Sequence, residues 1–243
     1  MKKSFSLIEL VIVIIVVGIL YSSISFSLSN TTLNQVADQI ISHINYTRHL
    51  AIKDNKMQYY PINNSKTEMN RSKYWFKQWW QMRFSNDSDD GYWYEIFTDL
   101  PTNGSSTNFE RTGGKPNTDN DYELTYAKNS NGKYLTGKCD DGSNYVKCGE
   151  NDNKLNLTDK YDIQKIVFSN LNSSKPHLLF DSYGNIYLTE GEKGDGGDIN
   201  PYDKDERVVL LKTAKITLCQ DEDCEKNISI CISAKIGNAY LCD

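Results

Sequence analysis

The chain has 243 residues and carries 27 Lys and Arg against 32 Asp and Glu, which gives a net charge of −5 at pH 7. This acidic balance argues against a general nucleic-acid binder, because phosphate contacts require clustered basic side chains. With only three histidines in the chain, most histidine-based metal sites and activated nucleophiles are difficult to assemble.

The N-terminal region combines a short basic leader with a long apolar segment. Residues 1–4 form the leader, and residues 5–28 are mostly apolar. About 20 helical residues cross the hydrocarbon core of a bilayer, so we expect residues 5–28 to span a membrane. The segment is too long for the apolar region of a secretory signal peptide. Lys2 and Lys3 would keep the N-terminus in the cytoplasm.

Glu9 places a carboxylate inside this apolar segment. A charged side chain at the centre of a membrane helix costs about 2.5–3.5 kcal/mol on insertion scales, which makes such a residue a functional candidate. The alternative is a position near the interface, where the carboxylate reaches the polar head groups.

The run from Lys3 to Val11, Lys-Ser-Phe-Ser-Leu-Ile-Glu-Leu-Val, resembles the processing site of type IV prepilins and pseudopilins. The resemblance implies that a prepilin peptidase cuts between Ser4 and Phe5 and methylates the new amine of Phe5. It also implies that Glu9 meets the N-terminal amine of a neighbouring subunit during assembly, where low dielectric strengthens a charge pair. The family usually has Gly before the cut; Ser4 departs from this pattern and leaves slow cleavage open.

Beyond Asn30 the chain becomes amphipathic. Its apolar residues largely follow helical spacing; they are Leu33, Val36, Ala37, Ile40, Ile41, Ile44, Ala51 and Ile52. The first proline is Pro61, so we expect one helix over residues 5–57, roughly 80 Å long at 1.5 Å per residue. The first half would lie in the membrane or the filament core, and the second half would carry a sheet.

Three further segments are similar to the GspH/FimT group of minor pseudopilins and minor pilins. The first is Thr47-Arg48 with Ala51-Ile52, in which Thr47 replaces the usual Ala. The second is the Phe-Asp-x-x-Gly turn within Leu179–Asn185, and the third comprises the closing strands and the turn Ile236-Gly237-Asn238. The resemblance implies an α+β fold, in which a long N-terminal helix packs on an antiparallel β-sheet domain with long, disulfide-stapled loops.

The expected β-rich domain covers residues 58–243. Residues 74–84 and 92–97 are aromatic-rich and are predicted strands, whereas residues 99–160 are predicted surface loops. We expect the tryptophans to fill a core or sheet face, with an exposed stacking platform for a ligand as the alternative; they are Trp75, Trp79, Trp80 and Trp93.

All six cysteines follow the apolar segment, and an even number favours disulfides in an oxidising compartment. They are Cys139, Cys148, Cys219, Cys224, Cys231 and Cys242. Pairing of neighbours along the chain is one arrangement, and crossed pairing of the last four stays open. Zinc is disfavoured, because the spacings contain no Cys-x-x-Cys pair and no histidine lies near.

Residues 190–206 concentrate acidic side chains and glycines. Calcium takes six to eight oxygen ligands from flexible loops, and such a run could supply them; the candidate ligands are Asp195, Asp198, Asp203 and Asp205. The alternative is a solvated acidic loop. A second motif, Glu225-Lys226-Asn227-Ile228-Ser229, meets the extended acidic sequon that some bacteria use for N-glycosylation, although Asn227 is expected to begin a strand.

We find no catalytic motif in the chain and do not expect an enzyme. The resemblance implies a minor pseudopilin or minor pilin of a type II secretion or type IV pilus-like filament. It would lie in the bacterial inner membrane as a single-pass protein with a periplasmic domain, and then enter the filament. Its partners would be other pilin-like subunits, prepilin peptidase, the inner-membrane assembly platform and membrane lipid.

Two alternatives differ in kind. A DNA-capturing minor pilin for natural transformation would use a basic C-terminal region, but residues 233–240 contain one lysine and no arginine, which makes a weak phosphate-binding surface. The other alternative is an anchored exported protein whose prepilin-like start is accidental.

Overall fold

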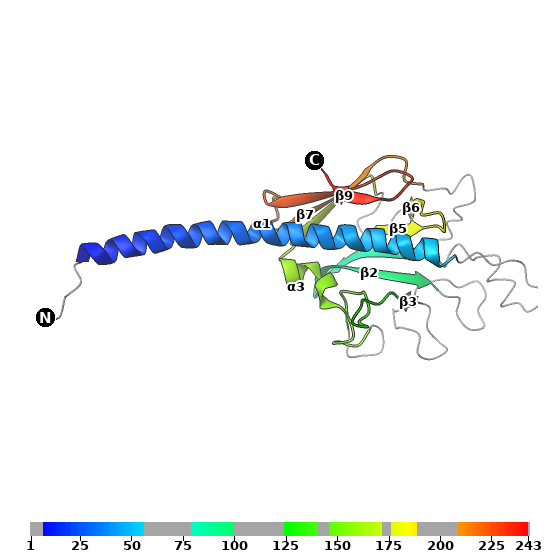
Figure 1. Ribbon diagram of the computed structural model, residues 1–243, viewed down its shortest axis with the longest axis horizontal. Helices are drawn as coiled ribbons and strands as arrows, with labels where there is room; N and C mark the ends of the chain where they lie inside the picture. Colours follow the sequence, from blue (N-terminus) through cyan, green and yellow to red (C-terminus); the bar gives the residue numbers. More distant parts are fainter. Residues whose placement is uncertain are drawn as a thin grey trace, which may run out of the picture.

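The computed structural model describes residues 7–55, 79–99, 124–139, 146–171, 176–188 and 209–242. It contains one long helix, two antiparallel sheets and two short helical segments (Figure 1). The predicted α+β class is therefore confirmed, with two sheets where one was expected.

Helix α1 runs from Leu7 to Lys53 and is 47 residues long. At 1.5 Å per residue this corresponds to about 70 Å. Its last hydrogen bond runs from the Asp54 amide to the Leu50 carbonyl at 2.8 Å. Figure 1 shows its N-terminal half projecting away from the sheets, while its C-terminal half lies against them. The predicted continuous helix is confirmed from Leu7 to Lys53, but Asp54 and Asn55 lie beyond its end although the predicted range extended to residue 57.

Among the described residues, the structure has no helix that combines the length and the apolar character needed to cross a membrane. The predicted span at residues 5–28 is not supported by this finding; its first two residues, and the side chains of residues 21–28, lie outside the described part.

The first sheet has the strand order β3-β2-β1-β5-β6. Its strands are β1 Trp80–Asp87, β2 Gly91–Asp99, β3 Leu124–Tyr126, β5 His177–Phe180 and β6 Ile186–Leu188. The central pair β1–β2 aligns Trp80 with Thr98 and Asp87 with Gly91. The aromatic-rich segments therefore do form neighbouring strands, as predicted, with β1 beginning at Trp80; residues 74–78 of the predicted strand lie outside the described residues.

The second sheet has the order β4-β7-β8-β9. Its strands are β4 Lys165–Ser169, β7 Ala214–Cys219, β8 Asn227–Ile232 and β9 Ala239–Leu241. The 3-10 turn η2 Asn153–Leu155 and the helix α3 Leu157–Tyr161 follow β3 and precede β4. Residues 99–160, which were predicted to be surface loops, thus include β3, η2 and α3.

The core lies between the C-terminal half of α1 and the two sheets. The buried helix residues are Leu33, Val36, Ala37, Ile40, Ile44 and Ala51, which matches most of the predicted apolar stripe. Ile52 departs from it and is 41% exposed. Trp79, Trp80 and Trp93 are buried, so the predicted core position is confirmed for these three and an exposed stacking platform is wrong for them; Trp75 lies outside the described residues.

Three disulfides close short loops within the domain. They join Cys139 to Cys148, Cys219 to Cys224 and Cys231 to Cys242. Pairing of neighbours along the chain is therefore correct and crossed pairing is not. The second disulfide spans the β7–β8 hairpin, and the third ties β8 to the residue that follows β9.

Candidate functional site

The N-terminal part of α1, which we name the arm, comprises Leu7–Leu20. Its large apolar side chains are all exposed, from 45% at Val11 to 82% at Leu7. Contiguous apolar surface of this kind is rare on monomeric soluble proteins and marks an interaction site. The arm projects beyond both sheets (Figure 1), so the described part of the domain does not cover it.

Apart from Glu9, the arm is apolar around its circumference. Isoleucine, valine and leucine occupy every position from Leu7 to Leu20 except Glu9 and Gly18. A Cβ atom built at Gly18 would meet no atom within 4 Å. A helix that is apolar on nearly all sides is typical of an element buried on all sides, whereas the apolar side chains of the arm are exposed.

Glu9 is the acidic residue in the first turn of α1, where a carboxylate interacts favourably with the positive end of the helix dipole. Its side chain is exposed on the arm. Ser4 and Phe5, the predicted cleavage residues, lie outside the described residues, and the predicted contact of Glu9 with a neighbouring amine stays a prediction.

The C-terminal part of α1, the turn between β5 and β6 and the turn between β8 and β9 meet around a single side chain, Arg48. Its Nε atom donates to the carbonyl of Gly184 at 3.0 Å and to the carbonyl of Ile236 at 2.9 Å. The first carbonyl belongs to the turn between β5 and β6, and the second to the turn between β8 and β9. We name this contact the Arg48 junction; it fixes α1 to both sheets at once.

Two glycines make the Arg48 junction possible. Gly184 has φ of +78°, and a Cβ atom there would lie 2.8 Å from Arg48 Nε. Gly237 has φ of +66°, and a Cβ atom there would lie 2.7 Å from the Phe180 ring. Both positions require the left-handed conformation that glycine adopts without strain, and neither has room for a side chain.

Asp181 shapes the turn that carries Gly184. Its Oδ1 accepts the backbone N–H groups of Tyr183 at 2.9 Å and Asn185 at 2.8 Å, while Oδ2 accepts from Asn185 Nδ2 at 2.9 Å. The residue is buried, and these donors satisfy the hydrogen-bonding capacity of its oxygen atoms. The Phe-Asp-x-x-Gly pattern therefore encodes a pre-formed turn beneath Arg48.

Asn45, one turn before Arg48 on α1, hydrogen-bonds the backbone of the edge strand β9. Its Nδ2 donates to the Ala239 carbonyl at 3.3 Å, and its Oδ1 accepts the Ala239 amide at 3.2 Å. The side-chain amide thus takes the place of a neighbouring strand. Sequence reasoning missed this residue, because nothing local distinguishes it from an exposed helix asparagine.

A chain of hydrogen bonds joins α1 to the first sheet and α3. Tyr161 Oη donates to Gln39 Oε1 at 2.6 Å, Gln39 Nε2 donates to Tyr94 Oη at 2.7 Å, and Tyr94 Oη lies 2.8 Å from His43 Nδ1. Because Tyr94 accepts from Gln39, its own proton is available to His43 Nδ1. Withdrawal from water lowers the pKa of His43, although Asp152 opposes the shift. The network therefore suits a neutral histidine.

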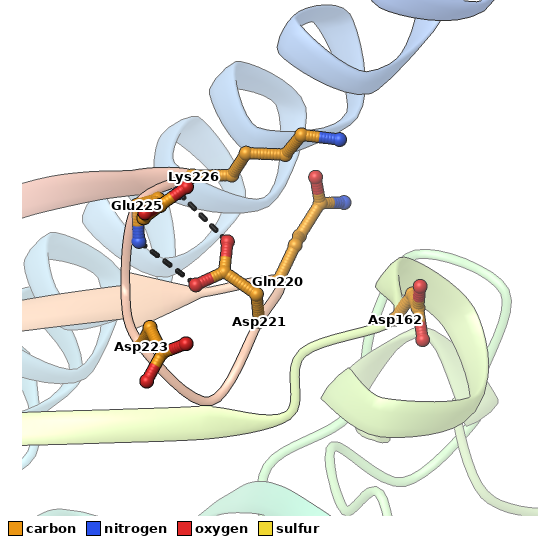
Figure 2. Close-up of a pocket in the computed structure, with 6 residues that line it drawn as sticks. All are labelled: Asp162, Gln220, Asp221, Asp223, Glu225 and Lys226. Atoms are coloured by element: carbon orange, nitrogen blue, oxygen red, sulfur yellow. Dashed lines mark hydrogen bonds between the residues drawn. The ribbon is translucent and has the colours of Figure 1, made fainter.

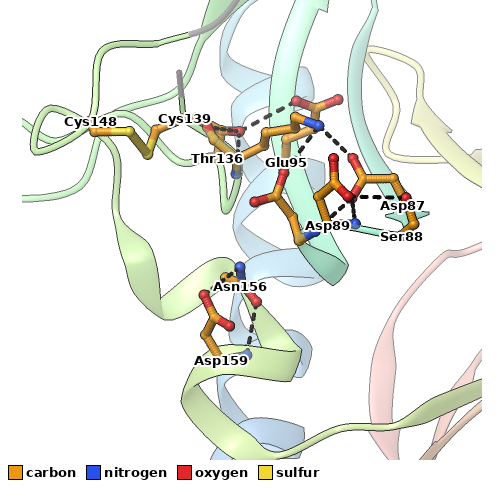
Figure 3. A network of polar contacts seen from close by, with 11 residues as sticks. Asp87, Ser88, Asp89, Glu95, Thr136, Cys139, Cys148, Asn156 and Asp159 are labelled. Carbon is orange, nitrogen blue, oxygen red and sulfur yellow. Dashed lines mark hydrogen bonds and ion pairs between the residues drawn. A yellow bond between two sulfur atoms is a disulfide. The ribbon is translucent and has the colours of Figure 1, made fainter. Parts of the chain in front are cut away.

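The opposite face of the first sheet holds a second polar network (Figure 3). Glu95 is fully buried, forms an ion pair with Arg83 and accepts from Tyr126 Oη at 3.0 Å. Near it, Lys138 Nζ contacts Asp87 at 2.5 Å and Asp90 at 3.1 Å. These contacts attach the segment around Lys138 to the sheet; they are structural anchors that the sequence did not reveal.

The predicted calcium ligands at positions 195, 198, 203 and 205 lie outside the described residues. Within the described part, no group of three or more His, Cys, Asp or Glu side chains is placed to hold a metal ion. One open pocket of about 480 Å³ is lined by Asp162, Gln220, Asp221, Asp223, Glu225 and Lys226 (Figure 2). Asp221 is already engaged there by the amides of Glu225 and Lys226.

Comparisons with models of known families, with curated proteins and with solved structures find no match. They leave the family open. The arm and the Arg48 junction therefore carry the functional argument.

Proposed function

We propose that the protein is a minor pseudopilin or minor pilin, a subunit that packs through α1 into a type II secretion or type IV pilus-like filament. The observation that carries the proposal is the arm: an apolar helix, exposed on every side, that projects from a folded domain. Such an element has no use in an isolated soluble domain, whereas a filament built from packed helices would bury it.

The energetics of burying the arm favour assembly. Full burial of one Val, Leu or Ile side chain contributes about 1.5–3 kcal/mol. The arm carries about a dozen of these side chains, each at least 45% exposed, so burying the remaining surface contributes on the order of 10 kcal/mol. That amount can offset the entropy lost when a subunit is immobilised.

The Arg48 junction supports the subgroup within this proposal. Three segments chosen for their similarity to one group of minor pilin-like proteins contact one another through Arg48, Gly184 and Ile236. If the similarity were accidental, the three segments would not be expected to contact one another. The Arg48 junction also connects α1 to both sheets, so a force applied to the arm would be transmitted to the domain.

In the proposed sequence of events, prepilin peptidase removes residues 1–4 and methylates Phe5. The assembly platform then moves the subunit from the inner membrane into the filament, where Glu9 meets the amine of a neighbouring subunit. Each of these steps rests on the resemblance of residues 3–11 to prepilins.

A charge on the arm tests the proposal. Val13→Asp places a carboxylate on the arm, whereas Leu211→Asp places one on an equally apolar, 73% exposed site of the domain. We expect Val13→Asp to abolish co-sedimentation with the filament fraction and Leu211→Asp to preserve it. Equal incorporation of both variants would contradict packing through the arm. Intact disulfides, checked by mass under non-reducing conditions, would show that each domain has folded.

A further inference from the structure

We propose that Asn227 is the attachment site of an N-linked glycan. The residue begins the triplet Asn227-Ile228-Ser229, and Glu225 lies two positions before it. The triplet is the acceptor pattern of N-glycosylation, and a carboxylate two residues earlier offers a charge-assisted contact to a basic side chain of the transferring enzyme. The inference does not depend on filament assembly.

The structure distinguishes Asn227 from the other triplets whose side chains it describes, which begin at Asn45, Asn86 and Asn156. Asn45 is engaged with Ala239, and its Thr47 is completely buried. Asn156 is a buried N-cap whose side chain accepts the amide of Asp159. Each of these two triplets therefore has a required residue withdrawn from the surface, Thr47 in the first and Asn156 in the second.

Asn86 begins the remaining described triplet, and no acidic residue stands two positions before it. Two residues before it stands Phe84, which is buried in the core. Asn227, in contrast, is exposed, as are Glu225 and Lys226 beside it. The acidic pattern and the accessible amide therefore coincide at Asn227 alone among these described triplets.

The turn before Asn227 is held in a defined shape. Asp221 accepts the amides of Glu225 and Lys226, each at 2.8 Å (Figure 2). The disulfide Cys219–Cys224 closes the same hairpin. On its other side β8 pairs with β9 only from Ile230 to Ile232, so that strand does not cover Asn227. The acid and the acceptor amide are thus presented together at the end of a hairpin.

The chemistry fits the hydrogen bond that Asn227 already makes. Its Nδ2 donates to the Cys224 carbonyl at 2.6 Å. In the transfer, Nδ2 forms a bond to the anomeric carbon of a lipid-pyrophosphate-linked oligosaccharide, and the bond from that carbon to the pyrophosphate oxygen breaks. The electron pair leaves with the pyrophosphate, and one amide proton passes to a base of the transferase. One N–H remains on Nδ2 and can keep the bond to Cys224.

Mass spectrometry of the full-length protein, purified from the cells that make it naturally, tests the site. After reduction and alkylation, trypsin cleaves at Lys226 and Lys235, so we expect a saccharide mass increment on the peptide of residues 227–235. Intact mass covers the case in which a glycan blocks cleavage at Lys226. An unmodified peptide at full abundance, with an unmodified intact mass, would overturn the proposal.

Four variants sharpen the test. Asn227→Gln and Ser229→Ala should remove the increment, and Glu225→Gln should lower its occupancy severalfold. Asn86→Gln is the matched control and should leave the increment unchanged. Persistence of the increment in Asn227→Gln would place the glycan elsewhere and refute the assignment; equal occupancy in Glu225→Gln would refute the role of the acid.

Discussion

At the residue scale, Gly184 and Gly132 have nearly the same backbone conformation but different surroundings. Substituting each of them therefore distinguishes the cost of backbone strain from the cost of a steric clash. Gly184 has φ of +78° and would push a methyl group into Arg48, whereas Gly132 has φ of +77° and open space around it. The left-handed conformation costs about 1–2 kcal/mol for an ordinary residue. Gly132→Ala therefore measures that cost alone.

Gly184→Ala should cost more than Gly132→Ala, because it also displaces Arg48 from the Gly184 and Ile236 carbonyls. We expect a difference of about 1–2 kcal/mol in the free energy of unfolding, the usual size of hydrogen bonds to a charged group. Urea denaturation of both variants checks it. Equal destabilisation would mean that the Arg48 junction adds nothing to stability.

His177 predicts how stability depends on pH. Withdrawal from water, together with the charge of Arg83, lowers the pKa of His177 to about 3, compared with 6.5 for an ordinary histidine. The unfolded chain therefore binds the proton first, and the contribution of His177 is complete above about pH 6.5 and is lost progressively as the pH falls toward 3.

We expect His177→Asn to reduce the loss of stability between pH 7 and pH 5, by up to about 1.4 kcal/mol per pH unit below 6.5. The exposed His49 provides the control, since His49→Asn should leave the slope unchanged. Urea unfolding at both pH values gives the slopes. A wild-type slope retained in His177→Asn would show that this histidine titrates normally.

At the scale of elements, α1 shows which buried side chains a helical sequence pattern can predict and which it cannot. Helical spacing predicted the buried residues from Leu33 to Ile44, because their burial follows from one face of a regular helix. Ile52 obeys the same spacing but is 41% exposed, because a helical period does not say where the covering sheets end. Pairing of neighbouring cysteines was one of the arrangements that the sequence left open, and the structure selects it.

Polar residues in the core were not predictable in this way. Asn45 and Glu95 look like ordinary surface residues in the sequence, and their roles arise from partners far along the chain, Ala239 for Asn45 and Tyr126 and Arg83 for Glu95. Propensity and periodicity carry no information about such partners. The arm, in contrast, needed no partner to be recognised, because its apolar run is continuous.

Asn45→Ala tests whether the helix holds the edge strand. The variant removes both bonds to Ala239, and we expect it to lower the free energy of unfolding by about 1–3 kcal/mol. The Ala239 amide should also exchange faster with deuterium, at least tenfold. Asn34→Ala, at an exposed position of the same helix, should do neither. Unchanged exchange at Ala239 would show that β9 is held by its sheet alone.

At the scale of the whole molecule, the described part of the chain consists of a packed domain and an exposed arm. In the domain, the sheets bury apolar side chains against α1, and three disulfides link its segments. The arm is open and, apart from Glu9, apolar on every side. A molecule of this kind is complete only when the arm is surrounded, which is the physical basis for the proposed filament subunit.

The most direct test of that account is the N-terminal mass of the native protein extracted from membranes. We predict a chain that begins at an N-methylated Phe5, since only prepilin processing produces that terminus from residues 1–9. A chain that retains Met1 or begins at Lys2 would contradict the account, and an anchored exported protein would then explain the arm.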